Sequence, residues 1–465
     1  MAVLRPVSRS FVHRLRLRAL HLDTLLRTAE SAPAEEGPGV VVSRGVSAHR
    51  YRVALETGGV RAGLHLASRL THIITAAPSP DQSLSPFRAL LKNRPVVPVE
   101  LPDGSTAWLV GGYEEVRQTL VDQRFSRALA VAPGRPLQGT EVFAAGSING
   151  LDPPEHTRLR KLVASAFTAR RVEALRPRVA IIVNELIDVL LDRPQPADLV
   201  TGFSLPLPVQ VICEMLGVPA EDVEQFHAWS DTILGDWQGD SDQIMTALVD
   251  LYNYFARLIE IKRAQPADDL MTALIAARDH ADRLSEEELT TLGCTLLIGG
   301  HETTANQINL SLLVLLDHPA ELGKLRADRE LIPGAVEELM RYVRLGGGLP
   351  PARVTTEDVQ LGGVTIPAGE AVLPLFATAN RDRSAFTDPD RFDISRAPAN
   401  HLAFGAGVHH CLGAQLARLE LQEAFRGLAG RMPGLRLAIL AKELRFTPGM
   451  ALHSLCELPV RWGEP

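Results

Sequence analysis

One stretch decides the fold of this 465-residue chain: Phe404-Gly405-Ala406-Gly407-Val408-His409-His410-Cys411-Leu412-Gly413. Its first two glycines permit a tight turn that other residues resist. Residues Leu412 to Ala429 then have the apolar spacing of an amphipathic helix, and Gly430 is placed to end it. Cys411 is therefore predicted at a helix N-terminus, where free N–H groups and the helix dipole stabilise a thiolate, the form that binds metals.

A lone intracellular cysteine is more often a small buried apolar side chain than a ligand. Here, however, the whole pattern Phe-Gly-x-Gly-x-His-x-Cys-x-Gly is present, and it resembles the haem-binding loop of the cytochrome P450 superfamily. The resemblance is to soluble, actinobacterial-like members. It implies that Cys411 is the proximal iron ligand and that the cofactor is haem b.

The same resemblance gives roles to the rest of the loop. His409 is expected to contact a haem propionate, and Phe404 to pack near the thiolate. The small residues Gly405, Gly407 and Gly413 would let the flat macrocycle approach the backbone. The neighbouring His401 and His410 have no predicted role.

A long helix with a polar centre is the second signal. Ser285 and Glu288 form a capping-box signature, and helical spacing continues to Asp317, a rod of about 50 Å. Its centre reads Gly299-Gly300-His301-Glu302-Thr303-Thr304 between apolar runs. The simpler interpretation is that the glycines allow close packing while the acid faces water; otherwise buried polar groups of this kind need a function.

This centre is similar to the oxygen-activation motif of the superfamily. The resemblance implies catalytic roles for Glu302, at the acid position, and for Thr303, the threonine that helps to protonate dioxygen. Local opening of the helix at Gly299 and Gly300 would leave a groove for dioxygen, with Gly300 near the cofactor. Thr304 is expected to support the backbone.

Basic residues predicted to bind the propionates come from two further segments. Asp152-Pro153-Pro154-Glu155 predicts a helix start, with an N-cap and prolines in the first turn. His156 and Arg160 then share one face, which is either an ordinary exposed face or an anion site. By resemblance to the propionate-binding helix of bacterial members, both are expected on haem carboxylates. Arg353, in the strand-like run Ala352–Thr355, matches a further propionate arginine.

Glu338 and Arg341 lie three residues apart in a predicted helix from about Pro333 to Tyr342. By themselves they could be a solvated ion pair. In the superfamily this Glu-x-x-Arg pairs with a later arginine, and Pro389-Asp390-Arg391-Phe392 supplies Arg391. We therefore expect Glu338, Arg341 and Arg391 to form a buried structural triad that shapes the cysteine loop.

The remaining pattern predicts a mainly α fold, the cytochrome P450 fold, with a large helical domain and small β-sheets. Runs Val96–Leu101 and Ala107–Val110 flank a Pro-Asp-Gly turn and predict a hairpin, and short strands are expected between Leu345 and Val372. Residues 81–465 are expected to form one domain. Residues 1–80 are interpreted as an N-terminal extension, disordered or from a wrongly assigned start, with a possible basic helix at Phe11–Leu26.

Charge and composition exclude other classes. The net charge is −7, unlike a basic nucleic-acid binder, although residues 1–80 carry eleven arginines and only five acids. Four scattered cysteines indicate neither disulfides nor a zinc site, and a reducing cytoplasm fits. No uninterrupted apolar run of about 18 residues occurs near the N-terminus, so a membrane-spanning anchor is not expected. A monomer is expected.

The family resemblance implies a monooxygenase that receives electrons from NAD(P)H through a separate ferredoxin and its reductase. Its substrates would be dioxygen and a small hydrophobic molecule, hydroxylated or epoxidised. Macrolides, terpenoids, steroids and xenobiotics all remain open. Residues expected to face the substrate by position are Ile298, Gly299 and Leu349. Peroxide-driven chemistry and a non-catalytic haem or ligand sensor are the alternatives; retention of Glu302 and Thr303 argues against both.

Overall fold

The structure is a computed structural model. It describes residues 53–57, 60–64, 84, 87–88, 91, 94–100, 106–132, 147–164, 166–234, 241–281, 284–346, 350–397, 400–447 and 452–463. Most of the expected N-terminal extension, including Phe11–Leu26, lies outside these ranges. Two short strands within it, β1 (Val53–Thr57) and β2 (Val60–Leu64), pair antiparallel, and the sequence analysis did not predict them.

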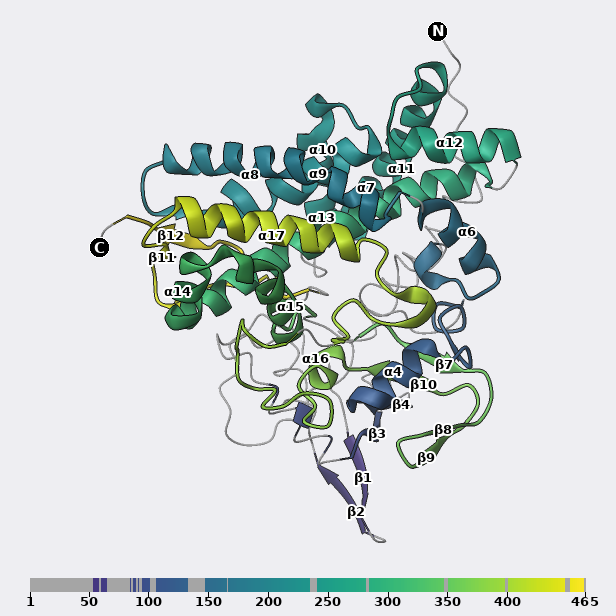
Figure 1. Cartoon of the computed structure of the whole chain (residues 1–465). Helices are drawn as coiled ribbons and strands as arrows, with labels where there is room; N and C mark the ends of the chain where they lie inside the picture. The colour runs from purple at the N-terminus through teal and green to yellow at the C-terminus, as the bar shows by residue number, and fades with distance from the viewer. Residues whose placement is uncertain are drawn as a thin grey trace.

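Helices dominate the described chain, as predicted (Figure 1). Their bounds are α4 (Tyr113–Val121), α6 (Glu155–Ala164), α7 (Ala169–Ala174), α8 (Arg176–Leu191), α9 (Pro206–Leu216), α10 (Val223–Leu234), α11 (Ser241–Ala264), α12 (Leu270–Ala281), α13 (Glu286–Asp317), α14 (Pro319–Ala327), α15 (Ile332–Tyr342), α16 (Phe376–Ala379) and α17 (Ala414–Arg431).

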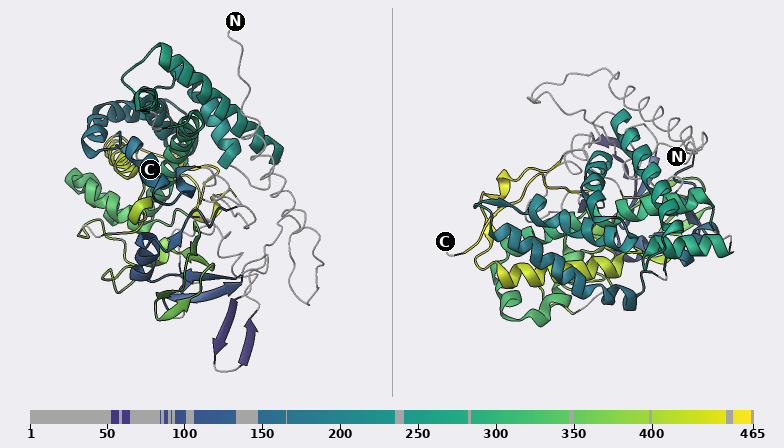
Figure 2. Two further views of the ribbon diagram at one scale, coloured as in Figure 1. Left: turned by 90° about the vertical axis from the view of Figure 1, so that its right-hand side faces the viewer. Right: turned by 90° about the horizontal axis from the view of Figure 1, so that it is seen from above.

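The remaining strands form small sheets gathered at one end of the molecule and beside its C-terminus (Figures 1 and 2). The largest has the order β3-β4-β10-β7-β5. The predicted hairpin is confirmed: β3 and β4 pair antiparallel from Val96 opposite Val110 to Glu100 opposite Thr106. The strand bounds are β3 (Val96–Glu100), β4 (Thr106–Val110), β5 (Phe125–Ser126), β6 (Ala197–Asp198), β7 (Arg353–Thr355), β8 (Val359–Leu361), β9 (Val364–Ile366), β10 (Ala371–Pro374), β11 (Arg436–Leu437) and β12 (Pro459–Arg461).

Alternating side chains place apolar residues on both faces of the five-stranded sheet. Val97 and Leu109 belong to one buried cluster, whereas Val96 and Val110 belong to another. This follows from the two-residue period of a strand. A much larger cluster fills the space between the helices and includes residues of α8, α9, α13, α15 and α17.

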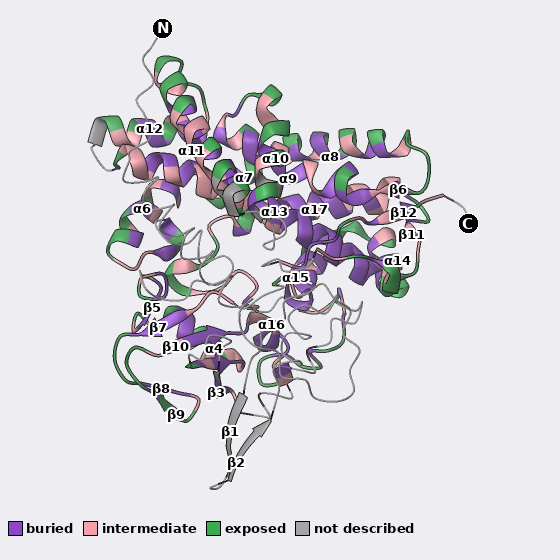
Figure 3. Cartoon of the chain, turned by 180° about the vertical axis from the view of Figure 1, so that it is seen from behind, coloured by how far each residue is buried: buried purple, intermediate pink, exposed green. Residues whose placement is uncertain are grey.

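The long helix α13 runs through this helical core (Figure 3). It begins with the predicted capping box: Glu288 N–H donates to Ser285 Oγ at 3.1 Å, and Ser285 N–H donates to Glu288 Oε2 at 2.8 Å. Nearly every side chain from Thr304 to Leu315 is buried. Within the described ranges, however, no helix is long and apolar enough to cross a membrane.

Two predicted helix ends differ from the structure. Helix α17 begins at Ala414 and continues to Arg431, so Gly430 lies inside the helix. The guanidinium of Arg329 lies beside Gly430, where a Cβ would come within 2.6 Å of its Nη1. The carboxylate of Asp152 does not cap α6; it accepts instead from Arg127 N–H at 2.8 Å and from Ala128 N–H at 3.3 Å.

The buried triad contains a different third arginine from the predicted one. Arg341 donates to both oxygens of Glu338, at 2.7 and 2.8 Å, and both side chains are buried. Arg396 Nε lies 3.1 Å from Glu338 and completes the group. Arg391 is 64% exposed and lies beside Asp393, so its predicted place in the triad is corrected. Arg391 instead contributes its backbone carbonyl, which accepts from Arg396 at 3.0 Å.

These two arginines provide a matched test of the triad. We expect Arg396→Ala to lower the free energy of unfolding by about 3 kcal/mol, because Glu338 would lose a charged donor in a buried site. Arg391→Ala removes an exposed side chain and should change it by less than about 0.5 kcal/mol. Urea unfolding followed by circular dichroism measures both. Equal losses in the two variants would contradict the corrected triad.

Candidate functional site

The cysteine loop has the tight turns that its glycines predicted. Gly405 and Gly407 have φ of +68° and +69°, a backbone conformation that side chains disfavour. Gly407 is also packed against the end of α4, since a Cβ there would lie 2.5 Å from the Leu120 carbonyl oxygen. The loop is closed by a hydrogen bond from Cys411 N–H to Phe404 O at 2.8 Å. Cys411 therefore lies just before α17, close to the predicted helix N-terminus.

The thiol of Cys411 is subject to opposing influences. Burial raises its pKa, while the N–H of Gly413 and the charges of Arg160 and Arg418 lower it. The net shift of this pKa is upward. A bound iron ion would supply the missing charge, because a coordinating thiol is deprotonated by the metal.

Basic side chains from three elements meet beside this loop. His156 and Arg160 come from α6, Arg353 from β7 and His409 from the loop itself. The rings of His156 and His409 lie 4.3 Å apart. Burial, followed by the charges of Arg353, His156 and others, lowers the pKa of His409 to about 3. The structure thus brings together four basic residues from three segments that are far apart in the sequence.

Arg127 is a fifth member that the sequence analysis missed. It is buried after β5, donates to Ala352 O at 2.6 Å and to Asn149 O at 3.2 Å, and its charge also lowers the pKa of His409. In the sequence it is a single arginine in Phe125-Ser126-Arg127-Ala128, with no periodic signal. Its position is fixed by the Asp152 carboxylate, which binds the backbone of this turn.

This basic cluster fits an anionic group of a cofactor. His156 Nδ1 and His409 Nε2 are buried and have no hydrogen-bond partner in the described chain. A buried polar atom without a partner is costly, and a carboxylate beside the two ring nitrogens could accept from them. The pair of haem propionates, with Cys411 on the same loop as His409, matches this arrangement.

The centre of α13 carries the predicted acid and hydroxyls. Glu302 is buried, and Asn306 Nδ2 donates to its Oε1 at 3.0 Å and to Ser454 Oγ at 2.9 Å. His301 Nε2 lies 3.7 Å from Glu302 Oε2. Asn306 was not predicted, because an amide inside an apolar helical run does not reveal which neighbour it contacts.

The threonines and glycines of α13 differ partly from expectation. The helix is continuous, without a break at Gly299 and Gly300. Instead, the carbonyl oxygens of these glycines accept from the hydroxyls of Thr303, at 2.9 Å, and Thr304, at 3.3 Å. The helix therefore keeps its form while two of its carbonyls are engaged by side chains.

The two glycines face different surroundings, because successive helical residues point about 100° apart. A Cβ at Gly299 would meet nothing within 4 Å, which agrees with an open space beside α13. A Cβ at Gly300 would lie 3.0 Å from Ile212 of α9, so Gly300 serves close helix packing. Its predicted place beside the cofactor stays a prediction. Ile298 is partly buried against the helical core, and Leu349 lies outside the described residues.

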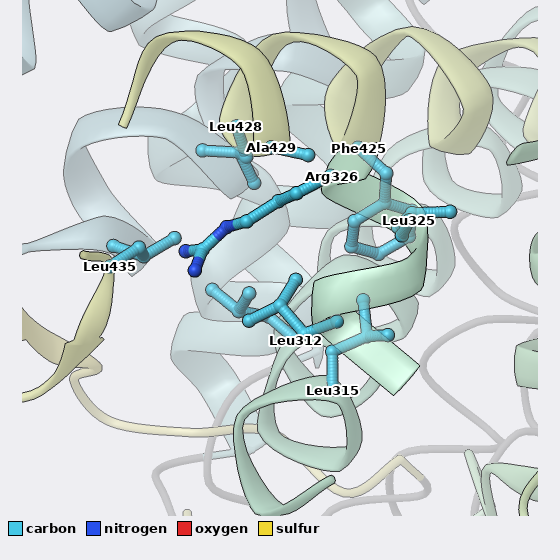
Figure 4. A pocket seen from close by; sticks show the side chains of 9 residues that line it. Leu312, Leu315, Leu325, Arg326, Phe425, Leu428, Ala429 and Leu435 are labelled. Atoms are coloured by element: carbon cyan, nitrogen blue, oxygen red, sulfur yellow. The ribbon is translucent and has the colours of Figure 1, made fainter. Parts of the chain in front are cut away.

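A small cavity elsewhere in the helical layer is not part of this site (Figure 4). It lies between the C-terminal end of α13, α14 and α17, and contains none of the predicted site residues. Arg326 points into it among leucine side chains (Figure 4). The lining residues are Leu312, Leu315, Leu322, Leu325, Arg326, Phe425, Leu428, Ala429 and Leu435.

Comparisons with known proteins show the family and the fold of this chain. The model of the family "Cytochrome P450" matches residues 95–426. The chain is 49% identical to nocardicin C N-oxygenase of Nocardia uniformis subsp. tsuyamanensis and 48% identical to mycinamicin IV hydroxylase/epoxidase of Micromonospora griseorubida. Each alignment covers 81% of this chain and 94% of the relative. The crystal structure of the LnmA cytochrome P450 hydroxylase of Streptomyces atroolivaceus superposes with a TM-score of 0.77 at 43% identity, covering 82% of this chain and 97% of that one.

The two loop glycines separate backbone strain from a steric clash. Gly405→Ala should lower the free energy of unfolding by about 1–2 kcal/mol, because only the positive φ opposes it. Gly407→Ala should lower it by about 3 kcal/mol or more, because its Cβ would also collide with the Leu120 carbonyl. Urea unfolding curves of the two variants measure the difference. A Gly407→Ala protein as stable as Gly405→Ala would show that the contact with α4 is not rigid.

Proposed function

This chain belongs to the cytochrome P450 family and is a monooxygenase, and we propose that it hydroxylates or epoxidises a small hydrophobic secondary metabolite with haem b as its cofactor. The observation that most strongly supports this proposal is the buried basic cluster beside Cys411, with two histidine nitrogens that have no hydrogen-bond partner among the described residues. Two of the relatives are named for oxidation of nocardicin C and mycinamicin IV. These names support a secondary metabolite as the substrate class.

The haem would be held by an iron ligand, by basic side chains at its propionates and by the residues that line the cysteine loop. Cys411 would ligate the iron, while His156, Arg160, Arg353 and His409 would bind the propionates, with Arg127 adding positive charge. Phe404, Gly405, Gly407 and Gly413 would line the loop under the macrocycle. When bound, haem with a thiolate ligand supplies the activation of dioxygen, so that one oxygen atom enters the substrate and the other leaves as water.

The side chains of α13 would deliver the protons for this reaction. Glu302 is buried but held by Asn306, so its carboxyl group has a fixed position in the helix. Thr303 hydroxyl donates to the Gly299 carbonyl on the side of α13 where Gly299 has open space. We assign Glu302 to proton supply and Thr303 to proton transfer at the site of dioxygen. Ile298 and Gly299 would contact the substrate, with Leu349 as a further candidate.

Electrons would arrive from NAD(P)H through a separate ferredoxin and its reductase. Two apolar residues are exposed near the cysteine loop. Val121, at the end of α4, is 42% exposed, and Val408, in the loop, is 38% exposed. The two segments are in contact, because Gly407 packs against Leu120 and Val121. Lys161, next to Arg160 on α6, adds an exposed positive charge. We propose this surface as the docking site of an acidic ferredoxin.

The carbon monoxide difference spectrum of the reduced protein tests the haem-thiolate site. We expect a Soret band at about 450 nm in the wild type and its loss in Cys411→Ser, because the hydroxyl is not a thiolate donor. Turnover with ferredoxin, its reductase and NADPH should give product without added peroxide. A folded wild type without a haem band, or product with peroxide alone, would overturn the proposal.

The two threonines of α13 test the proton pathway. Thr303→Ala should lower product formation by about 10²-fold, while NADPH oxidation continues and hydrogen peroxide accumulates, because a proton donor at dioxygen is lost. Thr304→Ala, the control, removes a hydroxyl that donates to the Gly300 carbonyl on the packed side of the helix. It should keep most of the coupling between NADPH use and product. Equal uncoupling in both variants would reject the specific role of Thr303.

A further inference from the structure

A second ionic cluster, separate from the propionate-binding residues, lies beside the cysteine loop. Glu337, the residue before the triad Glu338, accepts from Arg418 Nε at 2.6 Å and from Arg418 Nη2 at 3.0 Å. His401 Nε2 lies 3.2 Å from Glu337 Oε2. The side chains come from α15, α17 and the segment before the loop. None of them has a role in the function proposed above.

The hydrogen bonds of His401 fix its tautomer. Ala403 N–H donates to His401 Nδ1 at 3.3 Å, so this nitrogen is an acceptor and the ring proton is on Nε2. Nε2–H therefore donates to Glu337 while the ring is neutral. Burial alone would raise the pKa of Glu337, but the donors His401 and Arg418 lower it to about 2. Glu337 is consequently an anion at any working pH.

Arg418 connects this anion to the cysteine loop. Its guanidinium carbon lies 4.5 Å from the centre of the Phe404 ring, a cation–π contact, and the Phe404 carbonyl accepts from Cys411 N–H. The ring of His401 is 6.0 Å from the same phenyl ring. Arg418 Nη1 also donates to the carbonyl oxygen of Ala414, three residues after Cys411, at 3.4 Å. The charge of Arg418 therefore lies beside the cysteine loop, and Glu337 offsets part of it.

We propose that Glu337 is a positioning residue that, through Arg418, sets the reduction potential of the haem iron bound to Cys411. Its carboxylate holds the guanidinium flat on Phe404 and reduces the positive charge that the thiolate experiences. This inference rests on the proposed haem ligation. Without Glu337 the full charge of Arg418 would withdraw electron density from the sulfur and stabilise the reduced iron, which carries one more negative charge.

Neutral, nearly isosteric variants of the holoenzyme test the idea. We expect Glu337→Gln to make one-electron reduction about tenfold more favourable, a rise of about 59 mV in midpoint potential. Arg418→Gln should shift the potential in the opposite direction. The double variant should return near the wild-type value, because the two charges offset each other. A spectroelectrochemical titration measures all four proteins, and resonance Raman spectra of the carbon monoxide adducts report the electron donation of the thiolate.

Glu423→Gln is the matched control. Glu423 is a buried carboxylate on α17, but its ion pairs are with Arg176 Nη1, at 2.5 Å, and Arg426 Nε, at 3.6 Å, and neither arginine belongs to the cysteine loop. In Glu423→Gln the reduction equilibrium of the iron should change by less than about twofold, since the ion pairs of Glu423 lie on α8 and α17 outside the cysteine loop. An equal shift in Glu423→Gln would overturn the inference, because the effect would then be a general one of net charge.

The band at about 450 nm separates the two proposals. If the wild type lacks it, the haem-thiolate function itself fails. If all variants keep the band and Glu337→Gln has the wild-type potential, the role of Glu337 is rejected while the haem-thiolate function stands. If Arg418→Gln and Glu337→Gln shift the potential in the same direction, the effect is structural and the inference is again rejected.

Discussion

The cysteine loop depends on a buried ion pair in another part of the chain. Glu338 holds Arg341, and Arg341 Nη1 donates to the carbonyl oxygens of Asn380 and Pro389, each at 2.8 Å. Asn380 in turn accepts from Leu402 N–H through its Oδ1 at 2.6 Å. Leu402 O then accepts from Gly405 N–H at 2.9 Å, the first turn of the loop. A continuous series of hydrogen bonds thus runs from α15 to the turn that presents Cys411.

Glu337 and Glu338, two successive carboxylates of α15, have different roles because they point to different sides of the helix. Glu338 faces the segment 389–396 and fixes the backbone that leads to the loop. Glu337 faces α17 and the loop itself, where it meets Arg418 and His401. Desolvating a carboxylate is expensive unless charged donors surround it: Glu338 has two arginines, and Glu337 has Arg418 together with His401. The same short helix therefore supports both the shape of the loop and the charge around it.

The sequence predicted the elements whose signals are local. The capping box of α13 and the β3–β4 hairpin depend on residues close together in the chain, and both are confirmed. Partners that lie far apart in the sequence were harder to predict. Arg391 and Arg396 lie five residues apart in an irregular segment, and only the folded path of that segment turns Arg396 inward to Glu338. Arg127 and Asn306 were missed for the same reason, since their partners lie far away in the sequence or on another element.

The two glycines of α13 show a further limit of sequence reasoning. A pair of adjacent glycines in a helix indicates that larger side chains do not fit there. It does not show which neighbouring group approaches each glycine. The 100° step between them gives Gly299 open space and Gly300 the side chain of Ile212. Gly299 thus leaves open space beside α13, near Glu302 and Thr303. Gly300 allows α9 to pack closely against α13. The open side and the packed side of one helix are consequently set by neighbouring residues of identical type.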